Sequence, residues 1–197
     1  MIIILIYENN TFALSWAPFP RKHYGLFMVS AFLHPFAKPT RTDFRTLVRG
    51  QGAVVYDNQG NQYIDGMASL WYCAVGHGRS DMAESIARQA GTLAAYSTFD
   101  PFTNEPAEQL AEKLVSIGPM KDARVFFTSS GSEAVDTAMK LARLAHVQAG
   151  HPERTLIISR QRGYHGTAYG GTSAQGIPPN REGYGPLVGD VEQVPAD

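Results

Sequence analysis

The spacing of hydrophobic residues changes most sharply within residues 124–143. A short apolar run over Val125–Phe127 is followed by a turn rich in serine and glycine, 129–132, and then by apolar residues at helical spacing. Such a run is typical of a buried parallel strand, and the spacing after it is typical of an amphipathic helix. The pattern therefore predicts a strand, a Gly/Ser turn and a helix that runs from Glu133 to about Gln148.

The other strands are predicted from apolar runs bounded by turn residues. Residues 47–65 are an expected β-hairpin whose turn is 57–61. Another apolar run follows the helix 133–148, about thirty residues after the first strand, the length of one right-handed βαβ unit. The long glycine-rich segment 160–189 is typical of an active-site loop. The expected strands are Ala53–Tyr56, Gln62–Asp65, Val125–Phe127, Thr155–Ser159 and one that starts at Val191–Val194.

Two more helices are predicted between the hairpin and the central strand. Ser80 is expected to cap the first of them. Pro106 is placed in the first turn of the second, where its missing N–H does little harm, and Gly118–Pro119 is expected to stop it. The first helix carries an apolar face of Met82, Ile86, Ala90 and Leu93, and the second an expected buried stripe of Ala107, Leu110, Ala111 and Leu114.

The turn 129–132 is a candidate anion site. Unpaired N–H groups at a helix N-terminus point at one place, where the positive end of the helix dipole favours a phosphate. Gly131 permits the close approach of a ligand, and the serines add hydroxyl donors. A simpler interpretation is that Ser130 or Ser132 only caps the helix, with Glu133 complementing its dipole. The turn has neither the glycines of a dinucleotide-binding fingerprint nor the lysine of a P-loop.

A second loop is expected to reach the same place. Gly163-Tyr164-His165-Gly166 follows the expected strand 155–159. Both loops, 129–132 and 163–166, should therefore emerge from one edge of a parallel sheet. Ligands of such sheets bind outside the carboxyl ends of the strands.

Three segments carry a resemblance to a known family. They read F-F-T-S-S-G-S-E-A-V-D-T-A, then I-S-R-Q-R-G-Y-H-G-T, and nearer the N-terminus Y-I-D-G-M-A-S-L-W-Y-C-A-V-G-H-G-R. In this order and spacing they resemble the class III, pyridoxal-phosphate-dependent aminotransferases, in particular the ω-amino acid:pyruvate type. The resemblance runs from about Leu33 to Asp197. It implies an α/β fold of fold type I, truncated to an N-terminal segment and the first half of the large, mainly parallel-sheet domain.

The same resemblance implies pyridoxal 5'-phosphate (PLP) as cofactor and assigns its site. Gly131 and Ser132 match the family's phosphate anchor. Tyr164 matches the aromatic residue that stacks on the cofactor ring, and His165 lies beside the ring in relatives. The alternative for Tyr164 is a loop tyrosine that fills a packing gap.

Two aromatic residues match positions that the family uses near its substrate. Trp71 matches an aromatic that lines the substrate pocket, and its alternative role is in the hydrophobic core. Phe99 lies in a loop that in related enzymes reaches the other subunit's active site, and its alternative is packing on its own domain. His77 is expected to be structural, since nothing near it in the sequence pairs it as an acid or base.

Composition excludes several classes of partner. A net charge of −1 provides no basic field for nucleic acid, and the 6 histidines show no metal-ligand spacing. Cys73 is the only cysteine, which fits a reducing compartment and a cytoplasmic protein. The resemblance implies a homodimer at full length, with an amino donor and a keto acid as small-molecule substrates.

The N-terminal residues 1–27 lack the periodicity of the rest and are expected to lie outside the fold. Ile2–Ile6 is too short to span a membrane and has no basic flank, so no membrane partner is expected; a weak anchor remains an alternative. Met28 is a candidate start. The predicted organisation is this extension, an N-terminal segment over 28–80 with the hairpin, and a partial PLP-binding domain over 81–197.

No catalytic residue is assigned, because the family's Schiff-base lysine has no match. None of the lysines can be placed at the carboxyl edge beside Tyr164, so this chain alone is expected to be inactive. The intact enzyme would move an amino group from an ω-amino acid or amine to a keto acid such as pyruvate. The alternative is a catalytically dead module that binds PLP, another anion or a partner subunit, and a reading frame that continues past Asp197 to a lysine would favour the enzyme. The lysines are Lys22, Lys38, Lys113, Lys121 and Lys140.

Overall fold

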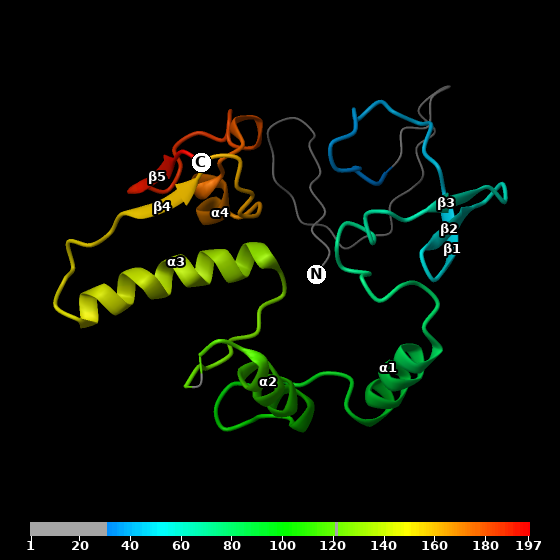
Figure 1. Ribbon diagram of the computed structural model, residues 1–197, viewed down its shortest axis with the longest axis horizontal. Coiled ribbons are helices and arrows are strands. Elements are labelled where there is room, and N and C mark those ends of the chain that lie inside the picture. The colour runs from blue at the N-terminus through cyan, green and yellow to red at the C-terminus, as the bar shows by residue number, and fades with distance from the viewer. Residues whose placement is uncertain (1–30, 121) are drawn as a thin grey trace, which may run out of the picture. The chain divides into compact units, whose positions relative to one another are not determined.

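The computed structural model describes residues 31–120 and 122–197, and the chain divides into two compact units, Met1–Ala95 and Tyr96–Asp197 (Figure 1). Both units contain helices and strands among their described residues, which agrees with the predicted mixed α/β class. The predicted extension 1–27, with Met28, lies outside the described residues and stays a prediction.

An antiparallel three-stranded sheet is the centre of the first unit. Its strands are β1 (Leu47–Gln51), β2 (Val54–Asp57) and β3 (Gln62–Ile64), paired in that order. The predicted hairpin is confirmed as β2 and β3, and β1 is an additional strand that the hairpin prediction did not separate. Asp57, at the end of β2, organises the turn between β2 and β3.

Helix α1 (Ser80–Thr92) follows the sheet, and its start corrects one prediction. Ser80 is the first helical residue and not the cap; Arg79 is the N-cap and makes no side-chain capping bond. The Arg79 guanidinium instead bonds the Asp81 carboxylate in the first turn, at 2.6 and 2.8 Å. That carboxylate complements the helix dipole, so a negative charge at the N-terminus replaces the hydroxyl cap.

The second unit joins helices to a parallel pair of strands. Its elements are α2 (Glu105–Ile117), α3 (Gly131–Gln148), β4 (Ile157–Arg160), α4 (Tyr169–Ala174), a 3-10 turn (Pro178–Asn180) and β5 (Val191–Val194). Strand β4 pairs with β5 in parallel, so the predicted strands near 155–159 and 191–194 are confirmed, the first displaced by about two residues. Short α4 contacts α3 and both strands, and Gly170–Ala174 within it are buried.

Helix α2 begins and ends where its sequence signals predict. Pro106 lies in its first turn and Gly118 is its C-cap, while the Asn104 side chain caps the N-terminus by accepting from the Ala107 amide at 3.0 Å. Its expected buried stripe is wrong for the two leucines: Leu110 and Leu114 are 50% and 40% exposed. No described helix or strand packs closely over this face, so spacing alone could not bury it.

The strand predicted at Val125–Phe127 is absent from the described structure, where these residues belong to no helix or strand. A strand exists only when a neighbour completes its hydrogen-bond ladder, and β4 and β5 pair only with each other. The helix after this run begins at Gly131, two residues earlier than predicted, and ends at Gln148 as predicted.

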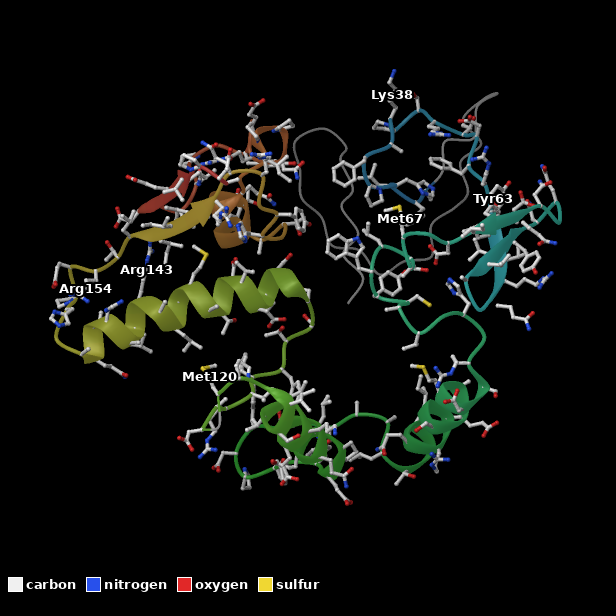
Figure 2. All side chains as sticks on the ribbon, in the orientation of Figure 1. Lys38, Tyr63, Met67, Met120, Arg143 and Arg154 are labelled. Carbon is white, nitrogen blue, oxygen red and sulfur yellow. The ribbon has the colours of Figure 1, made fainter. Side chains whose placement is uncertain are left out.

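Arg143 fixes α3 against the strand pair. Its guanidinium donates to the carbonyl oxygens of Thr155 and Gly189, each at 2.8 Å, just before β4 and β5 begin. Figure 2 shows the Arg143 side chain between α3 and the strands. One side chain therefore ties α3 to the chain just before both strands, at the end of β4 opposite to the loop 163–166.

Candidate functional site

Ser130, and not Ser132, caps α3. The Ser130 hydroxyl oxygen accepts a hydrogen bond from the Glu133 amide at 3.1 Å. The Glu133 carboxylate turns back and accepts from the Ser129 hydroxyl at 2.5 Å and the Ser129 amide at 2.9 Å. Those bonds, the hydroxyl's first, lower the pKa of Glu133. The capping interpretation of this turn is thus correct for Ser130 and leaves Ser132 for another role.

Two amides at this helix start have no partner among the described residues. They belong to Gly131 and Ser132, while the next two amides, of Glu133 and Ala134, bond to Ser130. A Cβ built on Gly131 would meet no atom within 4 Å, so the space beside these amides is open. Unpaired donors, an open approach and the positive end of an 18-residue helix together suit a phosphate group.

Ser132 joins this turn to the second predicted loop. Its hydroxyl oxygen accepts from the Thr167 amide at 2.9 Å and lies 3.5 Å from the Thr167 hydroxyl. Gly166 has φ +99°, and a Cβ there would lie 2.5 Å from the Ser132 hydroxyl oxygen. Only a glycine at position 166 therefore lets the loop approach Ser132 this closely. The two loops therefore meet, but the predicted reason, that each follows a strand of one parallel sheet, is wrong for the described structure, where no strand directly precedes 129–132.

Behind this contact, α4 holds the second loop in place. The Asp136 carboxylate accepts from the Gly171 amide at 2.9 Å, which satisfies a donor at the start of α4. The buried Gln175 side chain donates to the Gly166 carbonyl oxygen at 2.8 Å. Asp136 and Gln175 thus set the position of the loop, and neither was among the predicted site residues.

Tyr164 and His165 differ in their surroundings. The Tyr164 side chain is 59% exposed, so it is available to a ligand and does not fill a packing gap. The His165 Nε2 is buried and makes no hydrogen bond among the described residues. A Cβ on Gly163 would lie 2.9 Å from that nitrogen, so the ring is packed under its own loop.

The two predicted substrate-side aromatics lie in different units. Trp71 belongs to the first unit and is 83% exposed, which excludes a core role within that unit. Phe99 belongs to the second and is 84% exposed, although its neighbours Tyr96 and Phe102 pack edge-to-face at 5.2 Å. Each of the two side chains is therefore exposed within its own unit.

His77 has the partner that its sequence neighbourhood does not reveal. Its Nε2 lies 2.8 Å from the Asp65 carboxylate, twelve residues earlier, and both side chains are largely buried. That contact, followed by the Ser69 amide, lowers the pKa of Asp65. The expected structural role of His77 agrees with this geometry, but the reason offered for it, the lack of a pairing group, is wrong. Asp65 was missed, although it stands in one of the three family-like segments.

Trp71 ends a run of four non-glycine residues with left-handed backbone. The φ angles of Ala68, Ser69, Leu70 and Trp71 are +48°, +52°, +62° and +85°. L-residues adopt this region singly, at a cost of roughly 1–2 kcal/mol each. Surrounding contacts must therefore hold the segment.

Other kinds of site are not seen in the part of the chain that the structure describes. Within residues 31–120 and 122–197 no group of histidine, cysteine, aspartate and glutamate side chains is arranged to hold a metal ion. None of the helices described there is long and apolar enough to cross a membrane.

Comparisons with protein families and with curated proteins both find aminotransferases. The family model described as aminotransferase class-III matches residues 36–197. A β-alanine–pyruvate aminotransferase of Pseudomonas aeruginosa is 41% identical over 153 residues, which are 78% of this chain and 34% of the relative. An ω-amino acid–pyruvate aminotransferase of Pseudomonas putida is 37% identical over 153 residues, again 78% and 34% of the two chains.

A solved structure agrees in fold as well as in sequence. An amine transaminase from an uncultivated Pseudomonas species, in its PLP-bound form, superposes with a TM-score of 0.80 at 35% identity. The match covers 84% of this chain and 38% of that one. The chain spans about a third of the length of the curated relatives it matches.

Proposed function

Because this chain belongs to the class-III aminotransferase family, we propose that it is part of a PLP-dependent enzyme that moves an amino group from an ω-amino acid or amine to pyruvate or a similar keto acid. The observation that carries the proposal is the pair of unpartnered amides at Gly131 and Ser132, beside open space at the start of α3.

The residues of this chain fit the cofactor at its phosphate and its ring. The Gly131 and Ser132 amides would donate to the phosphate, and the Ser132 hydroxyl, while accepting from Thr167, still has its own proton to donate. The exposed Tyr164 ring would cover one face of the pyridine, with His165 beneath the loop that presents it. When bound, PLP supplies an aldehyde for the amino group and a ring that accepts electrons from the reacting carbon.

On the substrate side, we assign Trp71 and Phe99 to the pocket for the amino donor. Their exposure leaves both side chains free to contact a ligand or another subunit. The proposal includes a homodimer at full length and a cytoplasmic location. The net charge of −1 and the unbroken run of apolar, aromatic and small side chains at 67–76 favour small organic substrates over nucleic acid.

This chain by itself is proposed to be inactive, because none of the lysines in the described residues stands in the loops 129–132 or 163–166, beside which the aldehyde would lie. Lys113 and Lys140 lie on α2 and α3, and Lys38 lies in the first unit. Lys22 and Lys121 fall outside the described residues. The competing candidate, a catalytically dead module, is favoured by this same observation, since it needs the anion site and no lysine.

The anchor is tested by PLP titration of the purified chain and its variants. Gly131→Val fills the open space beside the amides, and Ser132→Ala removes a hydroxyl donor to a charged group, a loss of about 1.5–3 kcal/mol in affinity. Gly189→Val is a matched control, because a Cβ on Gly189 also meets nothing within 4 Å. Inorganic phosphate should compete with PLP in the unchanged chain. Unaltered dissociation constants in both anchor variants would show that the turn is a helix cap and nothing more.

The proposed inactivity of this chain is tested by mapping the lysines that PLP modifies. The chain is incubated with PLP, reduced with borohydride and digested for mass spectrometry, while amino transfer to pyruvate is assayed in parallel. Sparse labelling spread over surface lysines, without transfer, is the expected result. Stoichiometric labelling of one lysine together with transfer would overturn the proposed inactivity of this chain.

A further inference from the structure

The left-handed segment Ala68–Trp71 is held at its centre by one carboxylate. Asp65 accepts from the Ser69 amide at 2.8 Å and from the Ser69 hydroxyl at 3.2 Å. The same carboxylate lies 2.8 Å from the His77 Nε2. Asp65 therefore connects the middle of the strained segment to a histidine that lies beyond its end.

His77 is itself fixed to the sheet. Its backbone exchanges two hydrogen bonds with Gly52, at 2.9 and 3.0 Å. Its ring packs directly on Gly50 in β1, where a Cβ would lie 2.6 Å from the ring carbon Cγ. The imidazole position is thus set by the backbone of Gly52, just after β1, and by the absence of a side chain at Gly50.

The far end of the segment is tied to the same histidine. The Trp71 amide donates to the Met67 carbonyl oxygen at 2.8 Å, and the Cys73 amide donates to the Ala68 carbonyl oxygen at 2.9 Å. The Cys73 sulfur lies 3.5 Å from the His77 Nδ1. The two ring nitrogens of His77 therefore contact residues on both sides of Trp71.

We propose that Asp65 and His77 form a latch that holds residues 68–71 in their left-handed conformation and so positions the Trp71 side chain. They are positioning residues and need not touch a substrate. The inference rests on the proposed function only in one respect, that Trp71 is taken as part of the pocket for the amino donor. By fixing the position of the Trp71 ring, the latch would influence which donors fit that pocket.

Cys73 can report on the latch, because it is the only cysteine in the chain and a thiol reagent therefore modifies this one site. The rate at which a chromogenic disulfide reagent modifies Cys73 reports how often the segment opens. Asp65→Ala and His77→Leu should raise this rate roughly ten- to a hundredfold, the range expected when a hydrogen bond to a charged group is lost. His77→Gln, which keeps an N–H donor for Asp65, should restore much of the unchanged rate.

Two glycines, Gly50 and Gly66, provide a test variant and its control, and neither substitution removes a hydrogen-bonding group. Gly50→Ala should displace the His77 ring and accelerate the modification of Cys73. Gly66→Ala is the matched control, because a Cβ on Gly66 meets nothing within 4 Å. Hydrogen exchange of the β2 and β3 amides checks that the sheet persists, so a variant that merely unfolds is recognised.

The position of Trp71 is read separately by fluorescence. In a Trp16→Phe background Trp71 is the only tryptophan, and its emission maximum and quenching by acrylamide should change in Asp65→Ala, His77→Leu and Gly50→Ala. An unchanged Cys73 rate and unchanged Trp71 emission in these three variants would overturn the latch. Neither readout uses PLP or catalysis, so failure of the proposed function would appear only in the titration and transfer assays.

Discussion

Single carboxylates organise turns in the first unit by accepting several hydrogen bonds each, and Asp57 is the clearest case. One of its oxygens accepts from the Gln59 and Asn61 amides, both at 2.9 Å, and the other accepts from the Asn61 side chain at 3.0 Å and the Tyr63 hydroxyl at 2.8 Å. These bonds, the Asn61 side chain's first, lower the pKa of Asp57 from 3.8 to about 2, against the opposing effect of burial. The charged carboxylate thereby closes the turn between β2 and β3.

The hairpin should therefore lose stability in acid through this one group. The folded-state pKa lies below the unfolded value, so the contribution is complete above about pH 4 and is lost as pH falls towards 2. Asp57→Asn should increase the exchange rate of the Gln59 and Asn61 amides at pH 5, and this difference from the unchanged chain should shrink near pH 2. Asp43→Asn, at an exposed carboxylate outside the hairpin, is the control. A pH-independent difference would contradict the assignment.

At the scale of elements, the helix ends differ in how they are capped. Helices α2 and α3 have side-chain caps, Asn104 and Ser130, whereas α1 starts at Arg79 without one. Helix α2 has few tertiary contacts among the described elements, so its own ends must supply much of its stability.

Removal of the Asn104 cap should therefore be measurable in α2. Asn104→Ala leaves the Ala107 amide unpaired and should destabilise the helix by about 0.5–2 kcal/mol, while Asn104→Ser should retain most of the stability. Amide hydrogen exchange in residues 107–111 measures the effect. Asn58→Ala, in the turn of the first unit, should leave α2 unchanged, and equal protection in Asn104→Ala would show that the cap contributes nothing.

At the scale of the molecule, apolar surface is abundant. Among the described hydrophobic residues only Ala174 is buried, whereas Phe126 and Ile158 are 72% and 62% exposed. Most of the buried residues are polar or glycine and lie in or beside α4. Exposed apolar area of this extent is typical of a surface that another protein segment covers.

The purified chain should consequently self-associate. Light scattering after size exclusion should give a mass that rises with protein concentration, and an apolar dye should bind and fluoresce. Phe126→Ser with Ile158→Thr should reduce both effects, whereas Thr103→Ser, at an exposed polar residue, should not. A concentration-independent monomer without dye binding would contradict this expectation.

Local sequence was sufficient where neighbouring residues determine the structure. Pro106 and Gly118 bound α2, the turn 57–61 closes the hairpin, and the serine-glycine turn starts α3, because each signal acts on the backbone within a few residues. The family and its mixed α/β class were likewise readable from three short segments. The resemblance also selected Gly131 and Ser132, whose amides the structure leaves unpartnered.

Tertiary structure alone decided the contacts between residues distant in the sequence. Ser132 meets Thr167 and Asp136 meets Gly171, each across 35 residues, and Asp65 meets His77 across 12. The spacing of residues along the chain does not predict such pairs, because each depends on how two separately formed elements pack in the folded structure. The run at Val125–Phe127 is a prediction that failed for the same reason. Its composition suits a strand, but a strand also needs a neighbouring strand to pair with, and local sequence does not specify that neighbour.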